Sequence, residues 1–522
     1  MRFADVVATS ALVASESGRS AKRDLLAGLL AALAPDEVVP AVGFLTGEPR
    51  QGRIGVGWRT IASLDHPVAV EPTLLIADVD VALSAVAAQT GPGSGAARVA
   101  LLEAVYGRAT ADEARFLTLL LGGELRQGAS AGVMVEAAAK AAGVPATQLR
   151  RATMLGGRLD DTVALALTGG AAALGEVSLR VGRAVQPMLA SSSADAATAW
   201  EDAAVDGLAV VQHKLDGIRI QVHRGASPTG GPDAIRVFTR NLNDITDRLG
   251  DVVDAVADMP GGALVLDGEA LVTDLDNRPV AFQDTAGRVS ADQARPETVR
   301  PYFFDALHVD GVDLIDAPLT QRLDALRRSA AGWVVEGAQA TSAHEIADVN
   351  EGALAAGQEG IVVKDPTSAY AAGRRGSAWR KVKPVHTLDL VVLAVEWGHG
   401  RRRGWLSNLH LGARAEDGTG FVMVGKTFKG LTDDLLRWQT VRFLELAQRP
   451  APEPGEAPVG TVTVPPLQVV EIAVDGVQRS TRYPGGVALR FARVLRYRDD
   501  KPAEQADTIG AVQAMLAGSG GD

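Results

Sequence analysis

The stretch VVQHKLDGIRIQVHR, residues 210–224, decides how the fold of this chain is interpreted. An apolar run leads into Lys214, Asp216 and Gly217 supply a turn, and a second apolar run follows. The pattern predicts two β-strands, with an amine at the end of the first strand facing a cleft. A lysine in such a place is useful as a nucleophile only if nearby cations or desolvation lower its pKa.

Charged and aromatic residues that could supply this environment follow in the same block, which closes near Pro384. Glu269 ends one β-rich run (266–269), and Glu359 begins another (359–364). Lys381 and Lys383 alternate, so they share one face of a strand. Phe304 occupies the inner position of a further run (301–309). Each has an ordinary explanation when taken alone, as a turn acid, a solvated lysine or a core aromatic.

The flanking regions have different textures. Residues up to about 185 repeat apolar positions every three and four residues, as in 22–34, 97–109, 111–125, 131–143 and 160–170, which predicts helices. A run with Pro187 and three serines predicts a linker. After Asp389, five strand-like runs with a helix (432–448) between the third and fourth predict an OB-fold barrel. We therefore expect an α + (α+β) + β protein with domains at 1–190, 198–386 and 387–507, and a flexible tail at 508–522.

Composition limits the class of protein. The 522 residues are 47% hydrophobic and 22% charged, an ordinary globular mixture. The absence of cysteine excludes disulfides and cysteine-liganded zinc. Neither a signal peptide nor a run of about 18 apolar residues is present, so we expect a cytoplasmic protein, nucleoid-associated if bacterial, without membrane contact.

The net charge of −11 argues against nucleic-acid binding, but phosphate responds to local surfaces rather than to the sum of charges. Three arginines adjoin one another at 401–403. Six more fall within 20 residues near the C-terminus: Arg479, Arg482, Arg490, Arg493, Arg496 and Arg498. Such clusters permit binding to a phosphate backbone, although a run of charges is more often a solvated face.

Seven short motifs occur in a fixed order within about 290 residues: KLDGIR (214–219), FTRNL (238–242), LDGEAL (266–271), PYFFDALHVDG (301–311), EGIVVK (359–364), WRKVK (379–383) and RFARVLRYRDDK (490–501). Together they resemble the signature of the covalent nucleotidyltransferases, which include DNA ligases, RNA ligases and mRNA capping enzymes. The helical region, with GGELRQG (122–128) and QPMLA (186–190), is similar to the DNA-binding domain of three-domain ATP-dependent DNA ligases. The resemblance covers nearly the whole chain.

This resemblance implies an ATP-dependent DNA ligase that works as a monomer encircling nicked duplex DNA. Lys214 would take AMP from ATP, and Asp216 would serve the later phosphoryl transfers. Glu269 would hold the ribose, Phe304 would stack on adenine, and Lys381 and Lys383 would neutralise the phosphates. The remaining implied roles are ATP contacts by Gln212, Arg219, Arg498 and Lys501, binding of the nick's 5′-phosphate by Arg219 and Arg240, and Mg²⁺ or Mn²⁺ ligation by Glu359 and Glu269.

One position departs from the family pattern, because many such ligases have a glutamate where this chain has Gln212. An amide oxygen can still accept a hydrogen bond from the adenine amine, so ATP remains the expected nucleotide. Four other classes of protein fit this chain less well. A NAD-dependent ligase would need cysteines, and a GTP-using capping enzyme lacks a large helical domain in front. An ATP-dependent RNA ligase rarely has this length. A non-catalytic relative should have lost Lys214 or a metal-site carboxylate, and neither is lost.

Overall fold

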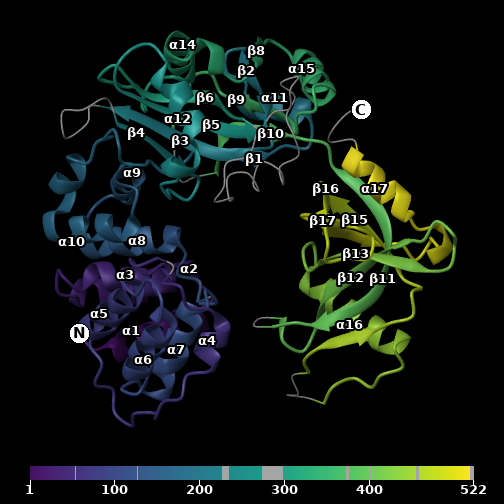
Figure 1. The fold of residues 1–522 in the computed structure, drawn as a ribbon, viewed down its shortest axis with the longest axis horizontal. Helices are drawn as coiled ribbons and strands as arrows, with labels where there is room; N and C mark the ends of the chain where they lie inside the picture. The colour runs from purple at the N-terminus through teal and green to yellow at the C-terminus, as the bar shows by residue number, and fades with distance from the viewer. Residues whose placement is uncertain are drawn as a thin grey trace. The chain divides into compact units, whose positions relative to one another are not determined.

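The computed structural model describes residues 1–52, 54–125, 127–225, 234–272, 298–371, 375–399, 402–453 and 458–517. These residues belong to two compact units (Figure 1). The first unit is Met1–Met188 with His223–Ala234 and Arg240–Asn243, and the second is Leu189–Val222, Ile235–Thr239 and Asp244–Asp522. None of the helices within the described ranges combines the length and apolar character needed to cross a membrane.

The first unit is helical, as predicted. Its helices are α1 (Phe3–Ser15), α2 (Arg19–Ala32), α3 (Val38–Thr46), α4 (Trp58–Ala62), α5 (Ile76–Ala87), α6 (Ser94–Tyr106), α7 (Ala111–Leu121), α8 (Ala131–Ala142), α9 (Ala146–Gly156) and α10 (Leu159–Gly175). The helices expected at 22–34, 97–109, 111–125, 131–143 and 160–170 are therefore confirmed as α2, α6, α7, α8 and α10.

Apolar side chains at helical spacing build the core of this unit. Phe3, Val6, Val7 and Val13 are buried on one face of α1. The Phe3 ring meets the rings of Phe44 on α3 and Phe116 on α7 edge-on, at centroid distances of 5.7 and 5.6 Å. Aromatic pairs favour this edge-to-face geometry, so one residue joins three helices.

The second unit begins with two five-stranded sheets. Their strands are β1 (Leu189–Ser192), β2 (Ala209–Lys214), β3 (Ile218–Gly225), β4 (Ala234–Thr239), β5 (Leu264–Val272), β6 (Val299–Val309), β7 (Val312–Asp313), β8 (Gly337–Ala340), β9 (Gly360–Lys364) and β10 (Arg375–Val382). One sheet has the order β1-β10-β9-β2-β8, and the other has β4-β3-β5-β6-β7. Lys214 ends β2 of the first sheet, and Arg219 lies near the start of β3 in the second. The predicted turn at 215–217 therefore passes from one sheet to the other.

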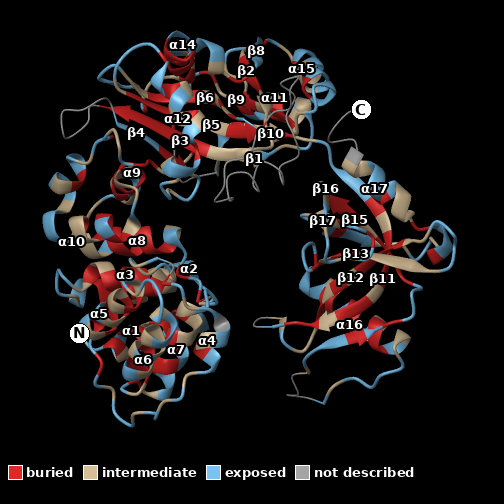
Figure 2. Ribbon diagram, viewed as in Figure 1, coloured by how far each residue is buried: buried red, intermediate tan, exposed pale blue. Residues whose placement is uncertain are grey.

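Helices cover both sheets. α11 (Ala196–Ala203) and α15 (Ala343–Ala355) pack against β2, β9 and β10 of the first sheet. α12 (Gly250–Ala257) and α14 (Leu319–Ser329) pack against β3, β5 and β6 of the second. Figure 2 shows buried residues concentrated along these strands and on the helix faces turned towards them. The packing leaves the strand ends, where the motifs lie, free to form a site.

The last part of the second unit is strand-rich, as expected. It contains β11 (His386–Trp397), β12 (Leu406–Arg414), β13 (Phe421–Thr427), α16 (Asp433–Leu446), β14 (Thr461–Thr463), β15 (Val469–Val474), β16 (Gly476–Arg479), β17 (Val487–Arg490), β18 (Arg493–Tyr497) and α17 (Ile509–Ala517). The antiparallel sheet β13-β12-β11-β15-β18 consists of the five predicted strands, and α16 is the predicted helix between the third and fourth. The β16–β17 hairpin and the short strand β14 were not predicted.

Two expectations about irregular segments were wrong. The serine-rich run expected as a linker contains β1, which pairs in parallel with β10, and the Ser191 hydroxyl donates to the Gly376 carbonyl at 2.9 Å. The tail expected to be flexible from 508 contains α17, because Val512 is buried in the barrel core and Ile509 packs beside it. Residues 518–522 lie outside the described residues.

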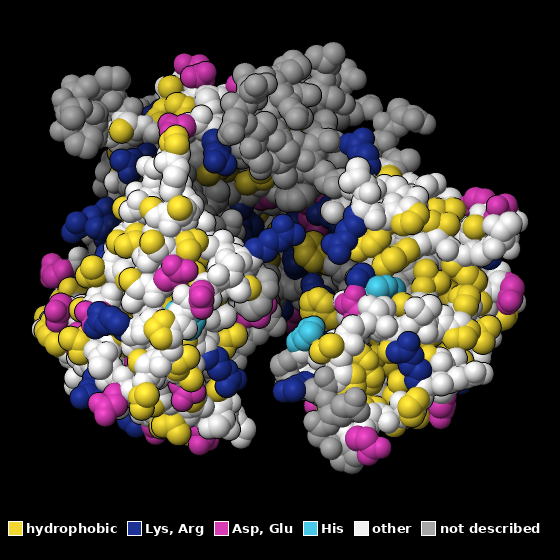
Figure 3. All heavy atoms as spheres, turned by 60° about the horizontal axis from the view of Figure 1, so that its bottom comes forward, with side chains coloured by type: hydrophobic (Ala, Val, Ile, Leu, Met, Phe, Trp, Pro, Cys, Tyr) yellow, Lys and Arg dark blue, Asp and Glu magenta, His cyan; other side chains and the backbone are white. Residues whose placement is uncertain are grey.

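The surface mixes both signs of charge. Figure 3 shows Lys and Arg side chains interspersed with Asp and Glu over the visible face, without one continuous acidic field. The net charge of −11 is thus compatible with local contacts to phosphate.

Candidate functional site

The pairing of β2 with β9 brings Lys214 to Glu359. Lys214 lies opposite Gly360 in the antiparallel register, and the Glu359 N–H donates to the Lys214 carbonyl at 2.9 Å. The Lys214 amine in turn donates to the Glu359 carboxylate. A side chain at 360 would collide with the neighbouring strand, since a Cβ there would lie 2.3 Å from the Val382 carbonyl oxygen. Glycine at 360 therefore lets three strand ends approach closely.

Two further lysines lie near Lys214 and Glu359. Lys381 belongs to β10, where it lies opposite Val362 of β9, and Lys383 directly follows that strand. The Lys383 amine donates to Glu359 at 3.1 Å and also pairs with Asp475. Burial opposes its charge, but these two carboxylates hold the pKa of Lys383 above its usual value. Burial, together with the charges of Lys383 and Lys214, lowers the pKa of Lys381. Lys214, the predicted nucleophile, therefore has two further lysines near it.

Glu359 is the acid at the centre of this cluster. Burial acts to raise its pKa, but the charges of Lys214 and Lys383 and their hydrogen bonds outweigh this and hold the pKa below the usual value. Glu359 is therefore ionised at neutral pH, which a hard cation ligand requires.

Glu269 faces the turn between Lys214 and Arg219. A Cβ at Gly217 would lie 2.5 Å from the Ala270 carbonyl oxygen and 2.9 Å from the Glu269 Cγ, so the turn can lie against β5 only with glycine there. The Gly217 N–H is hydrogen-bonded to the Glu269 carboxylate. Burial raises the pKa of Glu269 to about 7, against the opposing charges of Lys214 and Arg219. Such a carboxyl group can accept or donate a hydrogen bond near neutral pH.

Phe304 lies among cations and a second aromatic ring. The Arg219 Cζ is 4.6 Å from the centroid of the Phe304 ring, and the Lys364 amine is 4.8 Å from it. The same amine lies 4.0 Å from the Trp379 ring, which stands edge-on to Phe304 at 6.0 Å. Lys364 is only 2% exposed, and burial lowers its pKa to about 7. The predicted adenine platform therefore rests on a buried lysine.

Two ion pairs, each with a buried aspartate, adjoin this aromatic cluster. Arg219 donates twice to Asp267, at 2.6 Å each, and the Tyr370 hydroxyl donates to the same carboxylate. Arg322 donates to Asp305 at 2.7 and 3.0 Å, and both side chains are fully buried. Asp267 and Asp305 are thus each paired with an arginine. The Lys364 amine forms no ion pair with either of these described residues and lies over aromatic rings. Two-point pairing fixes the orientation of each guanidinium.

Gln212 lies two residues before Lys214 and is 4% exposed. Its side-chain oxygen, Oε1, is buried and has no hydrogen-bond partner among the described residues. A buried acceptor without a donor is costly, so a polar group that enters the site and donates to it is favoured. The exocyclic amine of adenine is such a donor.

The residues expected to act on DNA are placed differently. Asp216 receives hydrogen bonds from Arg490 of β17 at 2.8 and 3.3 Å, a pairing that the sequence motifs did not reveal. Arg240 directly follows β4, is exposed and belongs to the first unit. The 5′-phosphate roles of Arg219 and Arg240 stay predictions.

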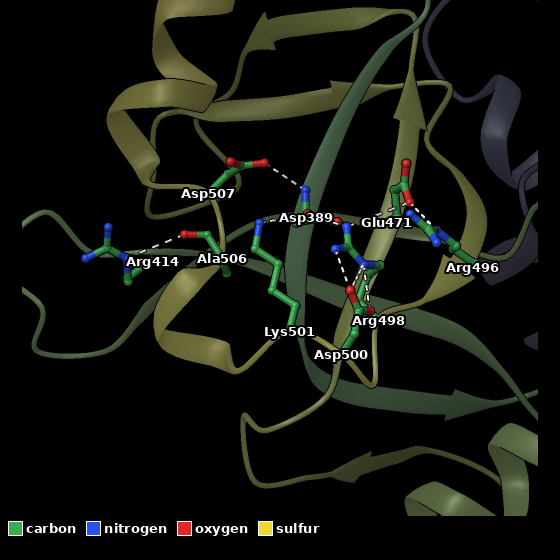
Figure 4. A network of polar contacts seen from close by, with 9 residues as sticks. All are labelled: Asp389, Arg414, Glu471, Arg496, Arg498, Asp500, Lys501, Ala506 and Asp507. Carbon is green, nitrogen blue, oxygen red and sulfur yellow. Dashed lines mark hydrogen bonds and ion pairs between the residues drawn. The ribbon is translucent and has the colours of Figure 1, made fainter.

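Arg498 and Lys501 lie in the barrel and are paired there (Figure 4). Both donate to Asp389, Arg498 at 2.9 Å and Lys501 at 2.8 Å, and Arg498 also donates to Asp500. Their role towards ATP stays a prediction. Sequence reasoning missed their shared partner, Asp389, because it lies more than 100 residues earlier in the chain.

The acidic side chains of the site could bind a divalent cation only together with ligands from outside the protein. In the described part of the chain, no group of three or more His, Asp or Glu side chains could enclose a metal ion. Mg²⁺ usually binds through one or two carboxylates, together with substrate phosphates and water. The ionised Glu359 beside Lys214 fits that mode, with the nucleotide completing the ligand set.

Family models match three parts of the chain. Residues 63–139 match "DNA ligase N terminus", residues 187–383 match "ATP dependent DNA ligase domain", and residues 402–501 match "ATP dependent DNA ligase C terminal region". The matched segments follow the helical region, the two-sheet region and the barrel in that order. The alternatives of an RNA ligase or a capping enzyme are not favoured by these matches.

Curated relatives match over the full length. A "Probable DNA ligase" of Saccharopolyspora erythraea is 52% identical over 98% of both chains, and one of Rhodococcus jostii is 51% identical over 99% of this chain and 100% of its own. Among solved structures, "Pmar-Lig_PreS3" aligns with a TM-score of 0.62 and 17% identity over 94% of this chain and 99% of its own. That structural likeness concerns the fold alone.

Proposed function

Because this chain belongs to the ATP-dependent DNA ligase family, we propose that it seals nicks in duplex DNA through an AMP carried covalently on Lys214. The observation that carries this proposal is the position of Lys214 at the end of β2, with Glu359, Lys381 and Lys383 at the ends of the adjacent strands. An amine, an acid and two further cations at one point suit attack on a polyphosphate.

In the first step, the Lys214 amine leaves Glu359, loses a proton and attacks the α-phosphorus of ATP. A P–N bond forms, the bond from the α-phosphorus to the oxygen bridging to the β-phosphate breaks, and pyrophosphate departs with the electron pair. Lys381 and Lys383 offset the negative charge of the phosphates. Arg498 and Lys501 bind the β- and γ-phosphates and align pyrophosphate opposite the attacking amine.

Three side chains hold the nucleoside. Phe304 stacks on the adenine ring, with Arg219 and Lys364 beside its own ring. The unpartnered Gln212 Oε1 accepts from the adenine amine. Glu269, whose pKa is about 7, binds the ribose hydroxyls. Mg²⁺ or Mn²⁺, held by Glu359 and in part by Glu269, would neutralise phosphate charge when bound.

Two steps follow on DNA. An oxygen of the 5′-phosphate attacks the AMP phosphorus, the P–N bond breaks, and Lys214 recovers its proton. The 3′-hydroxyl then attacks the activated 5′-phosphate, which forms the phosphodiester and releases AMP. Asp216 serves these transfers, and Arg219 and Arg240 bind the 5′-phosphate. The enzyme works as a monomer that encircles the nicked duplex through backbone contacts, since a general sealing enzyme ignores base sequence.

Replacement of Lys214 tests this proposal. Lys214→Ala should lose ATP-driven sealing of a nicked duplex by at least about 10³-fold, because the nucleophile is gone. The same variant should still seal a nick that already carries AMP on its 5′-phosphate, which serves as the internal control for folding. If Lys214→Ala seals an ordinary nick from ATP at a comparable rate, the assignment of the nucleophile is wrong.

A further inference from the structure

Asp389 binds Arg498 and Lys501, two cations of the barrel. The proposed function assigns these two residues to the β- and γ-phosphates of ATP. A single carboxylate oxygen, Oδ2, accepts from Arg498 Nη1 at 2.9 Å and from Lys501 Nζ at 2.8 Å. Figure 4 shows the two cations converging on this residue of β11 from the chain that follows β18. Two cations that share one acceptor atom are kept within a few ångströms of each other.

The backbone fixes the position of Asp389 itself. Its N–H donates to the Asp507 carboxylate at 2.7 Å, and the Asp507 N–H donates back to the Asp389 carbonyl at 2.9 Å. In the sheet, Asp389 lies opposite Glu471 of β15. The Asp389 side chain is 13% exposed, and those of Arg498 and Lys501 are 19% and 21% exposed. The carboxylate is therefore a fixed point of the barrel.

The other partner of Arg498 differs in its exposure. Asp500 accepts from Arg498 Nε at 2.9 Å and from Nη2 at 2.8 Å, but its side chain is 65% exposed. Exposed pairs contribute little and exchange readily with solvent or another anion. An approaching phosphate can thus replace Asp500 on Arg498 while Asp389 stays in place. The group of Arg498, Lys501 and Asp389 then carries one net positive charge.

We propose that Asp389 is a positioning residue of the adenylylation step, which keeps Arg498 and Lys501 together as one cationic pair for the β- and γ-phosphates. This inference rests on the proposed function of those two residues. Without the shared carboxylate, two like charges on long side chains repel each other and adopt many rotamers, and ordering them costs conformational entropy. Asp389 reduces that cost before ATP binds.

The test compares two substrates in Asp389→Asn, which keeps the shape of the side chain and removes its charge. Single-turnover transfer of labelled AMP from ATP to the enzyme should require at least about tenfold more ATP or run at least about tenfold more slowly. Sealing of a nick that already carries AMP should stay within about twofold of wild type, because pyrophosphate has no part in it. Equal loss on both substrates, or unchanged or faster adenylylation, would overturn the inference.

Two further variants serve as controls. Asp434→Asn removes the charge of an exposed barrel carboxylate that pairs with Arg437 on α16, and it should leave both reactions within about twofold. Asp389→Glu restores the charge. The rate of adenylylation should therefore decrease in the order wild type, Asp389→Glu, Asp389→Asn, whatever the melting temperatures of the three proteins. An order that instead follows thermal stability would assign Asp389 to folding and overturn the inference.

Arg498→Ala separates this inference from the proposed function. If that variant loses adenylylation and sealing of the AMP-carrying nick equally, the proposed ATP role of Arg498 is wrong. If it loses only adenylylation while Asp389→Asn behaves as wild type, the ATP role stands and the positioning role of Asp389 fails.

Discussion

At the scale of a residue, the proposed recognition of adenine depends on one buried atom of Gln212. Its side-chain oxygen is unpartnered among the described residues, two positions before the nucleophile. Its amide offers an acceptor oxygen without the charge of a carboxylate. A site that hydrogen-bonds one substrate group discriminates against analogues that lack it, since the buried group is then left unpaired.

We expect Gln212→Met to reduce the preference for ATP over inosine triphosphate, which has a carbonyl in place of the adenine amine. The loss of one hydrogen bond of about 1 kcal/mol predicts a reduction of roughly five- to tenfold in the ratio of kcat/KM values. Gln221→Met, at a buried glutamine on β3, is the matched control and should keep the wild-type ratio. An unchanged ratio in Gln212→Met would remove Gln212 from adenine recognition.

At the scale of elements, β9 connects the proposed nucleophile site to a buried lysine. The strand begins beside Glu359 and ends at Lys364, whose amine lies between the Phe304 and Trp379 rings with its pKa lowered to about 7 by burial. The charged groups that face it are Asp305, Arg219, Arg322 and Asp267. Burial of a lysine costs folding free energy, which a purely structural strand would avoid with an apolar residue.

This cost predicts a specific dependence of stability on pH. Because the pKa of Lys364 is lowered from 10.5 to about 7 in the folded state, the unfolded chain binds more protons between these values. Stability contributed by this group therefore rises with pH across that window, and the full cost is present below about pH 7. Lys364→Met removes the titration, so its gain in melting temperature over wild type should be greatest near pH 6–7.

The gain should shrink towards pH 10, where the wild-type amine is neutral in the fold. Allowing for the lost cation–π contacts, we expect a net gain of about 1–3 kcal/mol at pH 7. Thermal unfolding of both proteins from pH 6 to 10 measures it. A difference that does not change with pH would show that Lys364 keeps its ordinary pKa.

Lys364→Met should also need more ATP for adenylylation, because the Phe304 ring loses its contact with the Lys364 amine.

Most elements, and the positions of Lys214 and Glu359 at strand ends, could be predicted from the sequence for local reasons. Lys214 ends one run with clear β character, and Glu359 precedes another. The helices of the first unit follow the spacing of the apolar residues. Contacts between distant segments could not be predicted. Lys364 closes an ordinary apolar run, and the Phe304 and Trp379 rings that lie against its amine come from other strands. β1 is too short and too rich in serine to be seen without its partner β10.

At the scale of the whole molecule, an acidic chain has to bind DNA. Lys and Arg side chains are interspersed with acids on the visible surface (Figure 3), so affinity depends on local phosphate contacts. Binding of a nicked duplex should therefore weaken steeply between about 50 and 200 mM salt. A salt-independent affinity would show that these charges are only solvated.

The slope of that salt dependence assigns individual contacts. Arg240→Ala should reduce the steepness of the log–log plot by about 0.9, the value for one lost phosphate contact on duplex DNA. Arg327→Ala removes an exposed arginine that pairs with Asp324 on α14, and it should leave the slope unchanged. Equal slopes in wild type and Arg240→Ala would remove Arg240 from the DNA interface.

The intact mass of the protein shows whether Lys214 takes AMP from ATP. After incubation with ATP and Mg²⁺ without DNA, the mass of the wild-type chain should increase by one AMP. The mass of Lys214→Ala should not change, and addition of pyrophosphate should reverse the wild-type gain. An adduct on Lys214→Ala would show that another residue accepts AMP, and an adduct from GTP or NAD but not from ATP would show that ATP is not the donor.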